Sequence, residues 1–159
     1  MKTIVVYYSL EGNTKFIAER ITELTGANVI RLEPKKEYPT EGFKKFFWGG
    51  KSVMFNEKPA LLNEKIDFSQ YDNVVIGTPI WASSFTPPIL TFLTENKIEN
   101  KNVFLFACSL GGSADKCFTK MINLLPGNKI VSKESFTEPF KEPKEDTEQK
   151  VVNFCRNIL

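Results

Sequence analysis

The stretch TIVVYYSLEGNT (residues 3–14) decides the fold, because an apolar run passes directly into a polar turn that contains glycine. Residues 4–8 are β-branched or aromatic, as in a strand buried on both faces, and such strands occur in parallel sheets. Residues 14–24 follow with apolar side chains, Ile17 and Ile21 among them, on one helical face. The stretch therefore predicts a strand, a tight turn and a helix, which together begin a βαβ unit.

Similar apolar runs recur along the chain. Residues 74–76 and 103–107 predict two more buried strands, and the weaker runs at residues 29–32 and 129–136 predict two others, the last suited to a sheet edge. Helical patterns separate these strands. The alternation predicts an α/β fold, with a parallel sheet that is covered by helices on both faces.

Three later helices have recognisable starts or patterns. Thr86 stands before two prolines and predicts a helix N-terminus, and Ser113 is a candidate cap for the next helix. Residues 144–159 predict the last helix. The longest interval between strands contains residues 42–50, for which we predict a helix that is followed by a long excursion.

Composition limits the function. With 159 residues, 42% hydrophobic and 25% charged, the chain suits a single globular domain over residues 1–159. Its net charge of +2 is too small for a nucleic-acid footprint, so we expect no nucleic-acid partner. The chain has no histidine, which excludes a Ser-His-Asp triad, imidazole acid–base catalysis and histidine metal sites. Chemistry must come from other groups or from a cofactor.

The cysteines and the apolar runs predict a location. Cys108, Cys117 and Cys155 match neither a CxxC motif nor a zinc knuckle, so we expect buried, reduced thiols and no metal site. The apolar run at the N-terminus is short for a signal peptide, and no apolar stretch approaches the ~20 residues of a membrane span. We therefore expect a soluble cytoplasmic protein without a membrane partner.

Two other motifs are rejected. Gly49-Gly50-Lys51-Ser52 contains the end of a phosphate-binding P-loop, but Lys45 stands where that motif needs a glycine and no apolar strand precedes it. Cys108 follows a strand, as a phosphatase nucleophile does, but no arginine follows it at the spacing that such a loop requires.

Three turns follow predicted strands, at the edge of the sheet where ligands bind in doubly wound folds. Residues 9–14 can form a nest of backbone N–H groups for a phosphate, or they can simply cap a helix. Residues 78–84 include Trp81, which can stack on a planar ligand or close the core beneath the turn. Residues 108–114 contain paired glycines, which suit either a close ligand or a plain turn.

These three turns, in this order of elements, resemble the flavodoxin family over nearly the whole chain. Ser9, Gly12 and Thr14 match the family's loop of the type [ST]-x-T-G-x-T. The resemblance implies a three-layer, doubly wound fold with a five-stranded parallel sheet of strand order 2-1-3-4-5. It also implies noncovalently bound FMN.

The resemblance further implies what each turn does. The first turn would hold the 5′-phosphate of FMN, the second would line the flavin ring with Trp81 as the flanking aromatic, and the third would contact the pyrimidine end and the opposite face. No side chain receives a catalytic role. The implied cofactor-binding residues are Ser9, Leu10, Glu11, Gly12, Asn13, Thr14, Thr78, Pro79, Ile80, Trp81, Ala82, Cys108, Ser109, Leu110, Gly111 and Gly112.

The chain departs from the family pattern at two places. Glu11 replaces the threonine of the motif, so we expect its carboxylate to point away from a bound phosphate. Leu110, Gly111 and Gly112 stand where many flavodoxins stack an aromatic ring, which predicts that one face of the flavin is open.

Three hypotheses follow for the function. The first is an electron carrier that uses FMN and a redox partner protein or a small electron acceptor. The alternative is an NAD(P)H-dependent flavin reductase that acts on a quinone or a similar acceptor, in which Phe46, Phe47 and Trp48 would supply a homodimer contact. The third is a flavodoxin-like fold that has lost FMN.

Overall fold

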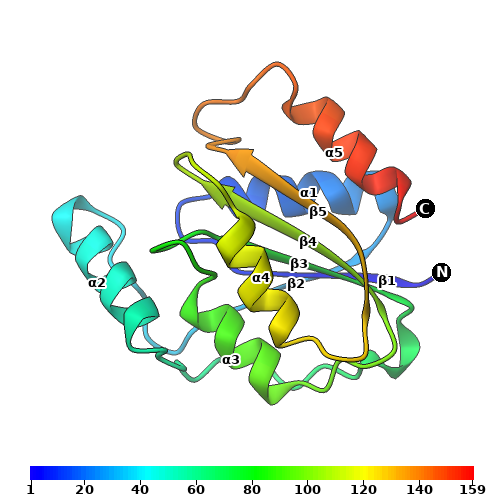
Figure 1. Cartoon of the computed structure of the whole chain (residues 1–159), viewed down its shortest axis with the longest axis horizontal. Coiled ribbons are helices and arrows are strands. Elements are labelled where there is room, and N and C mark those ends of the chain that lie inside the picture. Colours follow the sequence, from blue (N-terminus) through cyan, green and yellow to red (C-terminus); the bar gives the residue numbers. More distant parts are fainter.

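A parallel sheet forms the centre of the structure (Figure 1). The computed structural model describes residues 1–159, except the side chains of residues 42, 43 and 46. The sheet has five strands in the order β2-β1-β3-β4-β5, and each neighbouring pair is parallel. This confirms the predicted doubly wound fold and its strand order. The strands are β1 (Thr3–Tyr7), β2 (Asn28–Arg31), β3 (Asn73–Pro79), β4 (Asn102–Ser109) and β5 (Lys129–Thr137).

Helices cover both faces of the sheet, as predicted. Helices α1 (Asn13–Thr25) and α5 (Thr147–Arg156) lie on one face, and α3 (Pro87–Glu95) and α4 (Asp115–Asn123) lie on the other (Figure 1). Both chain termini lie at the end of the sheet opposite the carboxyl ends of the strands, which the arrowheads mark (Figure 1).

Strand β1 shows why its sequence is continuously apolar. Ile4 and Val6 pack toward α3 and α4, whereas Val5 and Tyr7 pack toward α1 and α5. All four side chains are buried. Because successive side chains of a strand point to opposite faces, a sheet with two helical layers needs apolar residues at every position.

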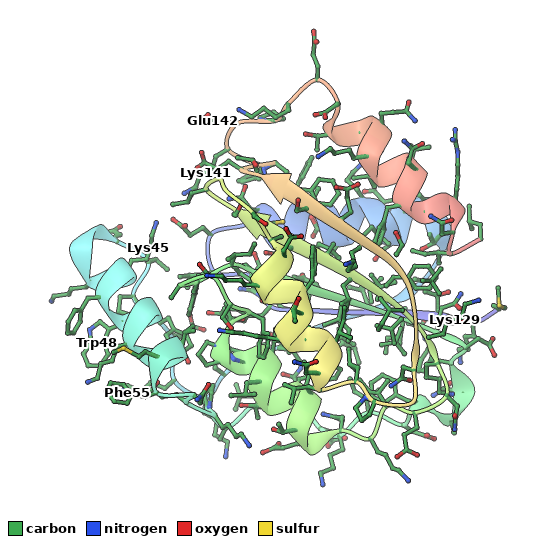
Figure 2. All side chains as sticks on the ribbon, in the orientation of Figure 1. Lys45, Trp48, Phe55, Lys129, Lys141 and Glu142 are labelled. Carbon is green, nitrogen blue, oxygen red and sulfur yellow. The ribbon has the colours of Figure 1, made fainter. Side chains whose placement is uncertain are left out.

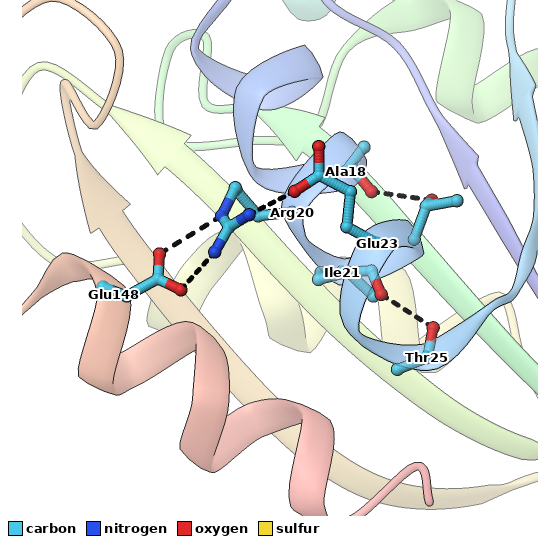
Figure 3. Close-up of polar contacts among 7 residues, drawn as sticks. Ala18, Arg20, Ile21, Glu23, Thr25 and Glu148 are labelled. Carbon is cyan, nitrogen blue, oxygen red and sulfur yellow. Dashed lines mark hydrogen bonds and ion pairs between the residues drawn. The ribbon is translucent and has the colours of Figure 1, made fainter.

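An ion-pair cluster joins α1 to α5 on the surface (Figure 3). The Arg20 guanidinium donates to both carboxylate oxygens of Glu148 and also contacts Glu23. Thr25 lies one turn farther along α1, where its hydroxyl donates to the carbonyl oxygen of Ile21 at 2.7 Å. Exposed ion pairs of this kind contribute little to stability, so the packing of α5 depends on its buried face.

The helix starts differ from prediction in three details. Thr86 holds the N-cap position of α3, as predicted, but its side chain makes no capping hydrogen bond, and its hydroxyl lies 3.3 Å from the hydroxyl of Thr78. The Ser113 hydroxyl accepts from the N–H of Asp115 at 3.1 Å, although residue 114 holds the N-cap position of α4. Helix α5 begins at Thr147 rather than at residue 144, because Pro143 and its neighbours form a loop.

The long interval between β2 and β3 contains α2 (Gly42–Met54) and a short 3-10 helix, Phe68–Gln70. The helix predicted at residues 42–50 is therefore confirmed, and it continues for one more turn. Helix α2 belongs to neither helical layer and stands beside the carboxyl ends of the strands (Figure 1). Strand β3 also continues beyond its predicted end, to Pro79.

Candidate functional site

A cavity of about 300 Å³ opens at the carboxyl ends of β1, β3 and β4, next to α2. All three turns singled out in the sequence contribute to its wall. The predicted residues that line it are Ser9, Leu10, Glu11, Asn13, Thr14, Pro79, Ile80, Trp81, Ala82, Cys108, Ser109 and Leu110. The structure thus brings together segments separated by more than half of the chain.

The first turn places polar groups at the N-terminus of α1. Gly12 is the N-cap residue, with a φ of 102° that favours glycine, and its N–H donates to the Ser9 hydroxyl at 3.2 Å. Thr14 lines the cavity and is 1% exposed. Among the described side chains, Thr14 Oγ1 is the one buried oxygen or nitrogen for which no hydrogen bond is found.

The Cys108 thiol is the polar group that interacts with Thr14. Burial raises the pKa of this thiol to about 12, and the Thr14 hydroxyl lowers it only in part. A neutral thiol is a weak hydrogen-bond partner. The hydroxyl of Thr14 can therefore still serve a bound anion.

Glu11 lines the cavity and lies between two lysines, Lys45 and Lys141, which are labelled in Figure 2. Its Oε1 accepts from Lys45 Nζ at 2.7 Å and from Lys141 Nζ at 2.9 Å. Burial alone would raise the pKa of Glu11, but the two hydrogen bonds overcome this effect and hold the pKa below its usual value. The two lysines therefore compensate the charge of this carboxylate beside the predicted phosphate turn.

The second turn fixes the Trp81 ring. Trp81 and Ser84 exchange two backbone hydrogen bonds of 2.9 Å, which close a two-residue loop. The Trp81 ring meets Tyr8 and Tyr38 edge to face, with centroid distances of 6.0 and 5.2 Å. Trp81 thus combines the two roles weighed for it, because it packs against the core and also lines the cavity.

Four predicted residues do not line the cavity: Gly12, Thr78, Gly111 and Gly112. Thr78 is fully buried and has a structural role, because its hydroxyl accepts from the N–H of Thr86 at 3.1 Å and so ties the second turn to α3. Gly111 donates its N–H to the Ser109 hydroxyl at 3.2 Å. The neighbouring Leu110 is 57% exposed at the cavity mouth.

Helix α2 supplies three lining residues that the sequence analysis did not assign, namely Lys45, Gly49 and Gly50. A Cβ on Gly49 would lie 3.3 Å from the Trp81 ring, whereas a Cβ on Gly50 would meet no atom within 4 Å. Glycine inside a helix costs roughly 0.5–1 kcal/mol relative to alanine, so a glycine pair there is a signal of close approach. In the sequence, the same pair belongs to the rejected P-loop motif.

Among the described residues, no group of three or more acidic or cysteine side chains is placed to hold a metal ion. In the same part of the chain, no helix combines the length and the apolar character needed to cross a lipid bilayer.

Comparisons with known proteins point to one family. The family model described as Flavodoxin matches residues 2–146. A flavoprotein from Lactobacillus acidophilus NCFM, solved in complex with FMN, is 24% identical with a TM-score of 0.73, and the match covers 84% of this chain and 92% of that one. A proposed flavoprotein from Bacteroides uniformis ATCC 8492 is 21% identical with a TM-score of 0.80, covering 96% and 97%.

A more distant structure has the same fold. Oxidised Flavodoxin 2 from Bacillus cereus is 16% identical with a TM-score of 0.56, and the match covers 99% of this chain and 97% of that one. Likeness at these identities demonstrates a shared fold, and the family model adds the sequence evidence. The chain belongs to the flavodoxin family.

Proposed function

We propose that this protein binds FMN noncovalently in the cavity and transfers electrons through it. The observation that carries the proposal is the buried Thr14 hydroxyl, which among the described residues has only the weak Cys108 thiol as a partner and which lines a cavity at the N-terminus of α1. A helix N-terminus with free N–H groups suits a phosphate. The similar Lactobacillus acidophilus flavoprotein was solved with FMN, which supports the same ligand here.

The residues of the cavity fit the parts of FMN. Ser9, Asn13 and Thr14 supply neutral polar groups for the phosphate, and the turn supplies backbone N–H groups. Trp81 offers an aromatic surface held in place by two tyrosine rings, and Gly50 leaves space that a side chain would fill. We propose that the predicted residues lining the cavity are the FMN-binding residues.

When bound, FMN supplies the one- and two-electron chemistry that the side chains of this protein lack. The protein holds the cofactor, orients it and limits its contact with water. Because the chain has no histidine, we assign no side chain to proton transfer. In this role the protein needs an electron donor and an acceptor, either a redox partner protein or a small molecule.

A second candidate function is a flavin reductase that oxidises NAD(P)H and reduces a quinone or a similar acceptor. The exposed Leu110 favours it, because this residue stands at the cavity mouth and leaves that side accessible to a small substrate. The loss of FMN, by contrast, was suggested by the uncompensated charge of Glu11. Lys45 and Lys141 compensate that charge, so we do not propose it.

Assembly and location are also proposals. Phe47 and Trp48 are 54% and 42% exposed on α2, and Figure 2 shows Trp48 on the outer side of this helix. This apolar surface supports a homodimer contact, which sedimentation equilibrium would test; Phe46 lies outside the described side chains. The three free cysteines support a reducing cytoplasmic location.

The experiment that tests the function is a titration of ligand-free protein with FMN. We expect a shifted visible absorption band, quenched flavin fluorescence, and a flavin that stays with the protein after removal of the excess. The loaded protein is then mixed with NADH or NADPH. Oxidation of either nucleotide supports the reductase, whereas no oxidation supports the carrier. Failure to retain FMN contradicts both.

A further inference from the structure

We propose that Glu11 is a stand-in partner for two lysines: in the ligand-free protein it pairs with Lys45 and Lys141 beside the cavity, and a phosphate monoester bound in the neighbouring turn replaces it as their partner. This inference rests on the proposed function and adds a specificity determinant to it. The two lysines would make the site selective for flavins that carry a terminal phosphate.

Three separate segments meet at one carboxylate oxygen. Lys45 comes from α2 and Lys141 comes from the loop after β5 (Figure 2). Glu11 lies in the turn after β1 and pairs with both. Only 18% of the Lys45 side chain and 23% of the Glu11 side chain are exposed, so water screens this pair incompletely. Two ammonium groups and one carboxylate leave the cluster with a net positive charge.

The loop that carries Lys141 is fixed against the turn predicted to bind phosphate. The Phe140 N–H donates to the Asn13 side chain at 2.9 Å. The Phe140 ring also packs on Gly12, where an added Cβ would lie 3.3 Å from the ring. Asn13 and Thr14 line the cavity in the same turn as Glu11, and among the described residues the Thr14 hydroxyl has only the weak Cys108 thiol as a partner. The lysines therefore lie beside polar groups that can bind an anion.

The charge of the anion determines whether the two lysines pair with Glu11 or with a phosphate. A phosphate monoester carries about −1.5 to −2 charges at pH 7, more than the single charge of the Glu11 carboxylate. A phosphate in the turn would be repelled by Glu11 and attracted by Lys45 and Lys141. The two lysines therefore pair with the phosphate instead of with Glu11. Riboflavin has no phosphate and gains nothing from this exchange.

The test compares two flavins that differ only in the phosphate. Ligand-free wild-type protein and the variants Lys45→Met, Lys141→Met and Glu11→Gln are titrated with FMN and with riboflavin by fluorescence. We expect Lys45→Met to raise the Kd for FMN by about tenfold or more, and Lys141→Met by a smaller factor because it is more exposed. The Kd for riboflavin should change little. Glu11→Gln should lower the Kd for FMN, because it removes the competitor.

Control variants distinguish the effect of the lysine charge from an effect on the structure. Lys97→Met removes a surface lysine that pairs with Glu99 far from the cavity residues, and it should leave both affinities unchanged. Lys45→Arg keeps the charge and should retain the preference for FMN. Inorganic phosphate alone should raise the Tm of the wild type more than that of Lys45→Met, and thermal melts show whether each variant is folded.

Each other outcome has a defined meaning. Equal losses for FMN and riboflavin in Lys45→Met would show that the lysine only positions α2, which overturns the inference. Weaker FMN binding by Glu11→Gln would overturn it as well, since Glu11 would then assist the phosphate. If no flavin binds but inorganic phosphate stabilises the protein through Lys45, the proposed function fails while the anion site stands.

Discussion

At the scale of single residues, Gly77 has the tightest packing of any glycine in the described structure. It pairs in register with Phe106 across β3 and β4, and a Cβ on Gly77 would lie 2.1 Å from the Phe106 ring. Real Cβ atoms do not approach so closely. The Phe106 ring fills the space beside Gly77 that a side chain at this position would need.

We therefore predict that Gly77→Ala destabilises the protein by about 1–3 kcal/mol, the usual cost of overpacking a core. Urea unfolding of the variant and the wild type measures the change. Gly50→Ala is the control, because a Cβ at Gly50 meets no atom within 4 Å and should stabilise the helix slightly. The double variant Gly77→Ala/Phe106→Leu should recover part of the loss. An unchanged stability of Gly77→Ala contradicts the prediction.

At the scale of elements, the turn between Trp81 and Ser84 stores backbone strain. Ala82 and Ser83 have φ values of 47° and 59°, in the left-handed region that residues with a Cβ avoid. Two-residue loops of this geometry normally contain glycine or asparagine. Such strain persists where the surrounding structure imposes it, and it is common at ligand sites.

Relief of this strain should be measurable. We predict that Ala82→Gly stabilises the ligand-free protein by about 1 kcal/mol, which corresponds to a rise in Tm of about 2–4 °C. Ala60→Gly is the matched control: Ala60 is exposed and its φ is not positive, so glycine should lower the Tm there. Calorimetry of both variants decides the matter. A lower Tm for Ala82→Gly would show that the turn is unstrained.

The elements also show where prediction from sequence succeeds. The strand, turn and helix of residues 3–25 are encoded locally, by an apolar run, a glycine at the turn and a helical periodicity. Lys45 and Gly49 are different, because their partners Glu11 and Trp81 are distant in the sequence. No local pattern gives the position of α2 over the cavity. Likewise Thr86 holds the N-cap position of α3, but its hydroxyl lies near the hydroxyl of Thr78 and makes no capping hydrogen bond.

At the scale of the whole molecule, apolar runs predict the number of strands but not their order. A parallel sheet of five strands admits several arrangements, and the order β2-β1-β3-β4-β5 was expected from the resemblance to flavodoxins. The weak apolar character of β2 and β5 agrees with their edge positions. The same order brings the ends of β1, β3 and β4 together, and so it creates the cavity.

The three cysteines can show whether the sheet and its two helical layers open together or separately. Cys108 lies in β4, Cys117 in α4 and Cys155 in α5, so the sheet and both helical layers each contain one. All three are at most 3% exposed. Burial raises the pKa of Cys108 and Cys117 to about 12 and that of Cys155 to about 11, from an ordinary value of 9.0. Each thiol is therefore both shielded and neutral at pH 8.

We predict that none of the three thiols reacts quickly with a thiol reagent at pH 8, and that all three react in denaturant, where they regain ordinary pKa values. The free energy of unfolding should also fall as the pH rises through about 9, because unfolded thiols ionise first while the folded ones stay neutral. If the layers open only together, native thiols react at one common slow rate. Rapid labelling of Cys155 alone would instead show that α5 detaches while the sheet stays folded.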